Sequence, residues 1–184
     1  MVAGFPESTY AVLGLIDKLP GSSGYELASV ASGSFAHFWP ISQTLLYREL
    51  KRLADLGWVV ATRVERAGAP LKWTYQTTPA GQKALDDWLA RPAPARSSFR
   101  SGFLLRFFFA YRMQPGQVRA LLEDYRGAMQ SLCDEFEAVI DKLEASATPQ
   151  ARAGRLTALH GLRTAEARLA WTDEVKVLLG ENLP

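Results

Sequence analysis

The chain has 184 residues, of which 48% are hydrophobic and 22% are charged, and its formal net charge is +2. This composition excludes a disordered chain, which would contain fewer apolar residues and more unbalanced charge. The length allows one domain with an extension, or two small domains. The lone cysteine, Cys133, excludes an internal disulfide framework and is typical of a protein in a reducing compartment.

Positive charge is concentrated in one segment. Residues 37–83 contain seven lysines and arginines against three acidic residues, a net of +4, whereas residues 101–184 contain ten basic and eleven acidic residues. Such an excess is the footprint of a phosphate-binding surface, or simply a solvated face of a neutral protein. The first apolar stretch contains Glu7 and Asp17, and residues 102–113 are too few to span a bilayer, so we expect a cytoplasmic protein without a signal peptide or membrane partner.

The first two predicted elements are helices. Ser8 or Thr9 is a suitable N-cap for the first, which Pro20-Gly21 ends, and Ser22 or Ser23 starts a short second helix. The connection that follows is too apolar for an exposed loop. We expect its aromatic residues to pack under the first helix; they are Phe35, Phe38 and Trp39.

The third predicted helix, from Ser42 to Gly57, has two different faces. At 100° per residue one face is apolar and is expected to be buried; it consists of Leu46, Leu50, Leu53 and Leu56. The other face is a narrow polar strip at positions i, i+3, i+4 and i+7, formed by Thr44, Tyr47, Arg48 and Lys51. Ser42 can cap the start of this helix, and Gly57 can close its end.

Two strand-like segments and a fourth helix complete the first half. Residues 58–66 and 71–77 alternate as strands and are joined by a short loop at residues 67–70. In the first strand we expect Trp58, Val60, Thr62 and Val64 to share one face. Thr78-Pro79 is a good N-cap and N1 pair for the next helix. That helix is expected to turn Ala84, Leu85, Trp88 and Leu89 inward.

The second half is predicted to be entirely helical after a linker at residues 91–98. A bulky aromatic stripe precedes Pro115 and consists of Phe99, Phe103, Phe107 and Tyr111. These rings either fill a core or line a cavity for a flat aromatic effector, and core packing is the better supported reading. A heptad seam follows, made of Val118, Leu122, Tyr125, Met129, Leu132, Phe136, Val139 and Leu143. A seam this regular on a lone helical hairpin would leave apolar area uncovered, so we expect these residues to form a dimer interface.

A helix followed by a hairpin is the order of a winged helix-turn-helix, and the polar strip has the chemistry for DNA. We expect Ser42, Gln43 and Thr44 to reach base edges, and Tyr47, Arg48 and Lys51 to contact phosphates or bases. The wing would add Arg63, Arg66 and Lys72, although charges on an edge strand also prevent aggregation. A winged-helix protein-interaction module without DNA binding is the alternative reading.

Catalytic chemistry has little support in the sequence. His37 and His160 are far apart and have no metal-ligand spacing with Cys133 or an acidic pair. No glycine-rich phosphate loop or nucleophile motif occurs. We therefore expect no enzyme activity, no cofactor and no metal.

Several motifs occur in an order that resembles the PadR family of bacterial transcriptional regulators. They are Ala11-Val12-Leu13-Gly14-Leu15, Gly24-Tyr25-Glu26-Leu27, Phe38-Trp39-Pro40, the segment from Leu46 to Leu53, Gly57-Trp58-Val59 and the segment from Tyr75 to Gly81. The match covers roughly residues 9–90. The helical second half looks like the longer branch of the family, with a virulence-activator-like C-terminal domain. Trp58 departs from the leucine that is more usual in the family, which should alter packing rather than DNA contact.

The resemblance implies a homodimer that binds a near-palindromic operator as double-stranded DNA, usually as a repressor. Family DNA contacts correspond to Ser42, Gln43, Thr44, Tyr47, Lys51 and Lys72, and Tyr25 matches a family tyrosine near the DNA backbone. Some members release DNA when a phenolic acid or planar drug binds. The expected fold is mainly α with a small β-hairpin, divided into a winged helix-turn-helix at residues 1–90, a linker at 91–98 and a helical dimerisation domain with long antiparallel helices at 99–184.

Overall fold

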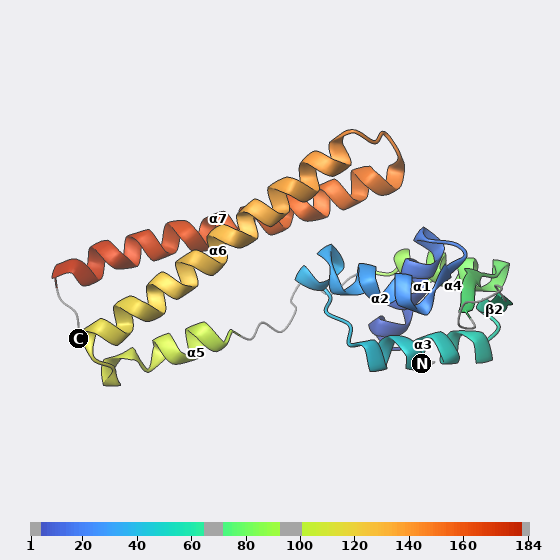
Figure 1. Cartoon of the computed structure of the whole chain (residues 1–184), viewed down its shortest axis with the longest axis horizontal. Helices are drawn as coiled ribbons and strands as arrows, with labels where there is room; N and C mark the ends of the chain where they lie inside the picture. Colours follow the sequence, from blue (N-terminus) through green and yellow to red (C-terminus); the bar gives the residue numbers. More distant parts are fainter. Residues whose placement is uncertain (1–4, 65–71, 93–100, 182–184) are drawn as a thin grey trace. The chain divides into compact units, whose positions relative to one another are not determined.

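The computed structural model describes residues 5–64, 72–92 and 101–181. The chain divides into two compact units, residues 1–95 and 96–184, and each is described by itself (Figure 1). The predicted fold is confirmed: the molecule is mainly helical, with a small antiparallel sheet in the first unit and two long helices in the second.

The first unit combines four helices with a three-stranded sheet. Its elements are α1 (Glu7–Lys18), β1 (Ser22–Ser23), α2 (Gly24–Ser32), the 3-10 helix η1 (Ser34–His37), α3 (Gln43–Asp55), β2 (Val59–Val64), β3 (Lys72–Thr77) and α4 (Pro79–Leu89). The sheet is antiparallel in the order β1-β3-β2. The short strand β1, in which Ser22 pairs with Tyr75, was not predicted, because two serines have no strand periodicity of their own.

Helix α3 forms where the sequence predicted it. The Ser42 hydroxyl accepts a hydrogen bond from the Leu45 N–H, and Gly57, with φ +68°, ends the segment in a left-handed conformation that favours glycine. Three of the four leucines are buried in the core of this unit: Leu46, Leu50 and Leu53. The prediction was wrong for Leu56, which is 38% exposed because it is the C-cap residue beyond the last buried turn.

Other predictions in this unit need correction. Helix α1 begins at Glu7 after Pro6, so neither Ser8 nor Thr9 caps it, whereas Ser23 caps α2 as expected. Phe35 packs against the core, but Phe38 is exposed, because the turn of η1 directs only one of the two rings inward. Leu89, the last residue of α4, is exposed rather than buried.

The strand β2 places Val59 in the core and leaves Val60 exposed, so the face that the alternation assigned to Val60 looks outward. Trp58 lies just before the strand and packs against the rings of Phe5 and Tyr10. Among the predicted wing residues, Arg66, Leu71 and the loop at residues 67–70 lie outside the described residues, as does most of the predicted linker.

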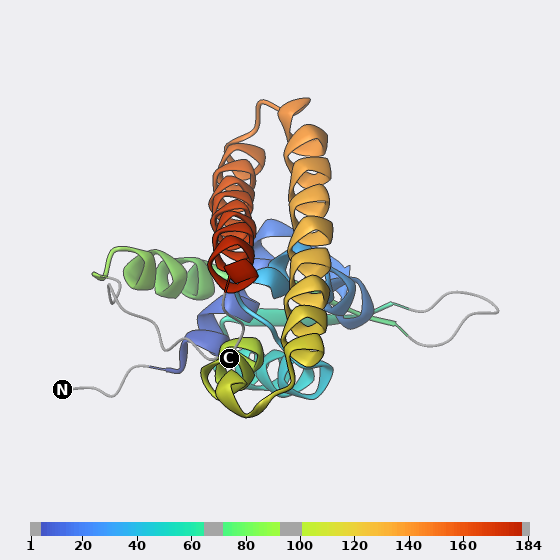
Figure 2. The same cartoon turned by 90° about the vertical axis from the view of Figure 1, so that its left-hand side faces the viewer.

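The second unit is built on two long helices. Its elements are α5 (Gly102–Phe108), the 3-10 helix η2 (Ala110–Arg112), α6 (Pro115–Glu144) and α7 (Pro149–Glu181). Helices α6 and α7 run antiparallel and side by side over most of their length (Figures 1 and 2). Phe99, the first residue of the predicted aromatic stripe, lies outside the described residues, and Tyr111 is exposed.

The heptad seam of α6 is covered to a large extent by its own chain. Val118, Leu122 and Phe136 are buried, the first two in a cluster with Val175 of α7. Phe136 packs with Ala158, Leu162 and Ala165 of α7. Three of the eight seam residues are therefore covered within the chain, because α7 is as long as α6 and packs along it. Tyr125, Met129, Leu132, Val139 and Leu143 are half-buried. Whether any of these eight residues forms a dimer interface stays a prediction.

The aromatic residues of the second half form a cluster within this unit. The ring of Phe103 stacks on Tyr125 with centroids 3.7 Å apart, and Trp171 of α7 meets both Phe103 and Phe107 edge-on. Trp88 belongs to the first unit, where its ring stacks on Tyr10. None of the helices in the described residues is long and apolar enough to cross a membrane.

Candidate nucleic-acid interface

The polar strip of α3 is exposed along its length. Thr44, Tyr47, Arg48 and Lys51 all reach solvent, as do Ser42 and Gln43 at the amino end of the helix. The Arg48 side chain is 67% exposed, although the neighbouring Leu50 is buried. The two faces of the helix therefore separate as its periodicity predicted, and hydroxyl, amide, phenol and cationic groups lie together on one surface.

Tyr47 is held against α2. Its ring lies so close to Gly24 that a Cβ atom at that position would come within 2.6 Å of Tyr47 Cε1. Tyr47 also lies near Tyr75 of β3: burial and, secondly, the proximity of Tyr47 raise the pKa of Tyr75 above its usual value of 10.0. Contacts with α2 and with the sheet thus orient the phenol while leaving it 43% exposed.

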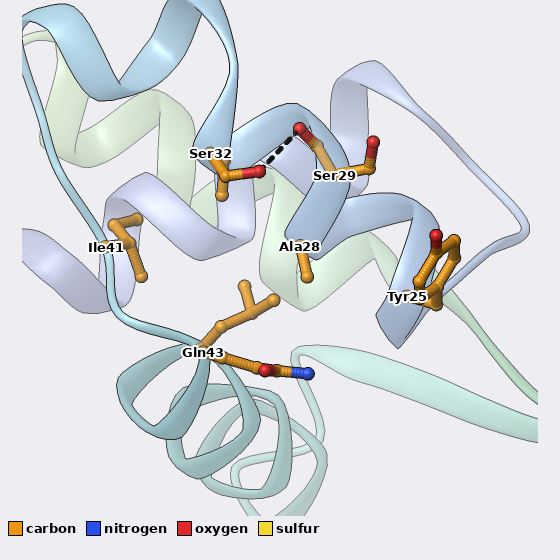
Figure 3. A pocket seen from close by; sticks show the side chains of 8 residues that line it. Tyr25, Ala28, Ser29, Ser32, Ile41 and Gln43 are labelled. Atoms are coloured by element: carbon orange, nitrogen blue, oxygen red, sulfur yellow. Dashed lines mark hydrogen bonds between the residues drawn. The ribbon is translucent and has the colours of Figure 1, made fainter.

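A hollow of about 280 Å³ lies between α2 and the start of α3. Figure 3 shows Ala28 and Ile41 beside this space, with Tyr25, Ser29 and Gln43 around it. Tyr25 is 76% exposed, so its phenol is available beside the amino end of α3. Polar side chains of α2 and α3 therefore share one surface.

The wing strand β3 is tied to α2 by an ion pair. Lys72 Nζ lies 3.2 Å from Glu26 Oε1, and the other oxygen of Glu26 accepts hydrogen bonds from the backbone N–H and the hydroxyl of Ser23. Hydrogen bonds from Ser23 and then from Lys72 lower the pKa of Glu26 to about 2. Lys72, one of the three predicted wing contacts, thus already has an anionic partner. Arg63 lies on β2, opposite Trp73.

Glu49 is a residue of this surface that the sequence analysis missed. It lies on α3, its side chain is fully buried, and Glu49 Oε2 accepts a hydrogen bond of 2.8 Å from the hydroxyl of Thr9 in α1. Arg48 Nε and Arg52 Nη1 lie 3.7 and 3.5 Å from its two oxygens. The sequence did contain a signal: at 100° per residue Glu49 falls between Leu53 and Leu56 on the apolar face, where a solvated carboxylate is not expected.

No group of three histidine, cysteine, aspartate or glutamate side chains arranged to hold a metal ion occurs in residues 5–64, 72–92 and 101–181. Burial is the main cause that raises the pKa of the Cys133 thiol, and the nearby carboxylates of Glu166, Glu137 and Asp134 raise it further. The raised pKa disfavours a thiolate nucleophile. In the described residues, α2, α3 and β3 together carry the exposed Tyr25, the polar strip of α3 and Lys72.

Comparison with known proteins identifies the family. The sequence profile described as "Transcriptional regulator PadR-like family" matches residues 12–87, and the one described as "Virulence activator alpha C-term" matches residues 99–180. The chain belongs to the PadR-like family of transcriptional regulators. This PadR-like protein is therefore a DNA-binding regulator by family and not an enzyme, and the resemblance seen in the sequence is confirmed.

Two relatives match most of the PadR-like chain. It is 29% identical over 140 residues to the negative transcriptional regulator PadR of Bacillus subtilis, an alignment that covers 76% of each chain. It is 30% identical over 178 residues to a probable transcriptional regulator of Mycobacterium tuberculosis, covering 88% of this chain and 92% of that one.

Solved structures share the fold. Bacillus subtilis PadR in complex with operator DNA has a TM-score of 0.84 at 24% identity, covering 95% of this chain and 99% of that chain. The same protein in complex with p-coumaric acid has a TM-score of 0.75, covering 94% and 98% of the two chains at 24% identity. The Vibrio cholerae virulence activator AphA, also 24% identical, has a TM-score of 0.71 with coverage of 95% and 98%.

Proposed function

We propose that this PadR-like protein is a homodimeric repressor that binds a near-palindromic operator through the polar face of α3 and the wing. The observation that carries the proposal is the separation of faces on α3: Tyr47, Arg48 and Lys51 are exposed, while Leu46, Leu50 and Leu53 are buried. A helix anchored in this way can present one side to the major groove. Bacillus subtilis PadR, which has the same fold, forms a complex with operator DNA, and this supports DNA binding by the present chain.

Each predicted contact has a role that its position supports. Ser42, Gln43 and Thr44 at the amino end of α3 would meet base edges, and Tyr47, Arg48 and Lys51 would contact bases or phosphates. Tyr25 on α2 would contact the DNA backbone. Arg63 and Lys72 lie on the wing strands, and Arg66, outside the described residues, belongs to the same hairpin in sequence. Because Lys72 is paired with Glu26, its role would be to position the wing as much as to bind phosphate.

The test is to select a duplex from a random library with the wild-type protein and to measure its affinity in a gel-shift experiment. Tyr47→Ala and Lys51→Ala should each weaken binding by roughly 5- to 150-fold, since one good base contact is worth roughly 1–3 kcal/mol. Lys83→Ala is the matched control, because Lys83 is an exposed lysine of the same unit that pairs with Asp87 on α4. It should bind like the wild type.

Salt dependence distinguishes DNA binding from the alternative function. Phosphate contacts release counterions, so affinity should fall steeply as salt rises, and Lys51→Ala should reduce that slope by roughly one ion. If no sequence is enriched from the library and a protein complex forms that is insensitive to salt, the proposal fails and the protein-interaction reading replaces it.

The homodimer is supported by exposed apolar side chains in the second unit. Leu105, Phe108 and Tyr111 of α5 and η2 are each more than 60% exposed, and Val177 and Leu178 of α7 are exposed at 76% and 74%. Burial between two chains would stabilise such surface by roughly 25 cal/mol per Å². The half-buried seam residues Tyr125, Met129, Leu132, Val139 and Leu143 would contribute their remaining surface. Val118, Leu122 and Phe136 would then support the interface from beneath, because α7 and α5 already cover them.

Light scattering on the full chain tests the dimer. The wild type should have twice the chain mass of 20.3 kDa, and Phe108→Glu should shift it toward the monomer at micromolar concentration. Leu156→Glu, a substitution of an equally exposed leucine on α7, tests whether the effect is specific to α5. A monomeric wild type would contradict the proposal.

An aromatic effector is supported by the rings of Phe103, Phe107, Tyr125 and Trp171, which lie together in the second unit. The structure of Bacillus subtilis PadR with p-coumaric acid makes a phenolic acid the first compound to test. Release of the selected duplex by p-coumaric acid, but not by a non-aromatic acid of similar size, would support this part. We also place the protein in the cytoplasm, where its DNA target would be.

A further inference from the structure

We propose that Glu49 is a positioning residue for DNA recognition, which sets sequence discrimination by holding the guanidinium of Arg48 in one orientation. The inference rests on the proposed function and deepens it, because it names the residue that orients a cationic side chain of α3 for sequence-specific contact with DNA. Nothing in the proposed function requires a carboxylate within the apolar face of α3.

The first observation is that Glu49 is buried at a cost. Its side chain is 0% exposed, and moving a carboxylate out of water is unfavourable unless it is paired and hydrogen-bonded. Only Oε2 receives a hydrogen bond, from Thr9; within the described residues Oε1 has no hydrogen-bond donor. A leucine would fill the same volume without this cost. A carboxylate here therefore serves something other than packing alone.

The second observation is what lies beside the unsatisfied oxygen. Oε1 is 3.7 Å from Arg48 Nε, and Arg48 belongs to the exposed strip of α3. The approach is through Nε, which leaves the two terminal amino groups farther out along an exposed side chain. Those amino groups can form the bidentate contact by which arginine reads guanine. When DNA covers the helix and excludes water, the lower dielectric strengthens the attraction between the carboxylate and the guanidinium.

The third observation is that the carboxylate is fixed from the opposite side. Thr9 belongs to α1, so its hydrogen bond of 2.8 Å joins Glu49 to an element that does not contribute to the strip. Arg52 Nη1 also lies 3.5 Å from Oε2, on the flank of the helix. Glu49 is thereby anchored by Thr9 and Arg52 on one oxygen and directs the other oxygen to Arg48.

The negative charge of Glu49 has a second effect, which is to lower the affinity of the protein for DNA of any sequence. A carboxylate below the strip opposes the approach of phosphates, so its removal should raise affinity for any duplex. Neutralising Glu49 is therefore expected to strengthen non-specific binding while weakening discrimination. A purely structural role would not have this effect, because loss of fold weakens binding to all DNA.

The experiment compares the affinity for two duplexes of equal length and composition: one selected from a random library by the wild type, and a scrambled version of it. Glu49→Gln keeps the shape and the acceptor for Thr9 but removes the charge. We expect the ratio of the two affinities to fall about tenfold, the size of one bidentate base contact, while the scrambled duplex binds at least as tightly as before. Lys83→Ala is the matched control, because Lys83 is an exposed lysine of α4 that pairs with Asp87 and does not touch Glu49, and it should change the ratio less than about twofold.

A double-mutant cycle then tests whether Glu49 acts through Arg48. In an Arg48→Ala background, Glu49→Gln should leave the ratio unchanged within about twofold, because there is no guanidinium left to orient. Arg48→Lys keeps the charge but loses the planar fork, so it should lower the ratio as much as Glu49→Gln does. This surface substitution tests the inference even if Glu49→Gln unfolds.

The possible results distinguish a failure of the proposed function from a failure of the role proposed for Glu49. If the wild type enriches no duplex, the proposed function itself fails. If a duplex is enriched but Glu49→Gln and Arg48→Lys both retain its discrimination, only the role of Glu49 is overturned. Additive losses in Arg48→Ala and Glu49→Gln would also overturn it, since they would show that the carboxylate acts independently of Arg48.

Discussion

Tyr47 of α3 lies directly across Gly24 of α2, so closely that a methyl group at Gly24 would come within 2.6 Å of the ring carbon Cε1. Gly24 is the first residue of α2 and is buried. Its missing side chain leaves room for the phenol of Tyr47, which packs against α2 and still reaches the surface. The orientation of a predicted DNA contact thus depends on a glycine of another helix.

This contact predicts that Gly24→Ala will weaken DNA binding without unfolding the protein. The added methyl must displace the Tyr47 ring, and losing one hydrogen bond from its phenol would cost about 1 kcal/mol, or about fivefold in affinity. The measurement is a gel-shift titration with the selected duplex. Gly14→Ala is the control, because a Cβ at Gly14 would meet only Leu85, at an ordinary 3.8 Å. Equal affinities for both variants would show that Tyr47 is not the group affected.

The hydrogen bonds and ion pair of Glu26 predict a pH dependence of stability. Its pKa of about 2 in the folded protein lies below the ordinary value of 4.5, because Ser23 and Lys72 donate to the charged form. A depressed pKa contributes stability that is fully present above about 4.5 and is lost as pH falls toward 2. Urea unfolding of wild type and Glu26→Gln should therefore differ at pH 6, and the difference should shrink on acidification to pH 3. A constant difference would rule out the charge of Glu26 as its cause.

The buried hydroxyl of Thr9 predicts a cost for removing one donor. Thr9→Val keeps the volume but leaves the carboxylate of Glu49 without its hydrogen bond, which should destabilise the first unit by about 1–3 kcal/mol. Thr172→Val is the matched control: Thr172 is equally buried, but its hydroxyl donates to the Leu169 carbonyl of its own helix. That change should cost less than about 1 kcal/mol, because no buried charge loses a partner. Comparable shifts in the urea midpoints would contradict this account.

Alanine substitution at two glycines of the long helices is predicted to change the stability of the second unit in opposite directions. A Cβ at Gly161 of α7 would lie 2.2–2.7 Å from the ring of Phe136, which is buried between the helices. Overpacking of about 1–3 kcal/mol should exceed the roughly 1 kcal/mol that alanine adds as a helix former, so Gly161→Ala should destabilise the second unit. Gly127 of α6 faces open space, so Gly127→Ala should stabilise it by up to about 1 kcal/mol. Thermal unfolding measures both, and a shift of the same sign would refute the packing argument.

Local patterns in the sequence were sufficient to predict the helices, the caps of α2, α3 and α4, and the two faces of α3. Ser42 and Thr78 cap their helices as expected, since a cap and the first turn are only three residues apart. The exposure of Lys51 and the burial of Leu50 follow from the period of the helix, which is also a local property. These residues carry the family resemblance and most of the candidate DNA contacts.

The tertiary structure decided which partner covers each face, because that depends on packing between segments far apart in the chain. Thr9 is 40 residues from Glu49, and Lys72 is 46 residues from Glu26, so no spacing rule could have joined them. For the same reason the heptad spacing of α6 could not show that α7 of the same chain covers Phe136. Periodicity states that an apolar side must be buried, but only the balance of packing and desolvation energies determines what buries it.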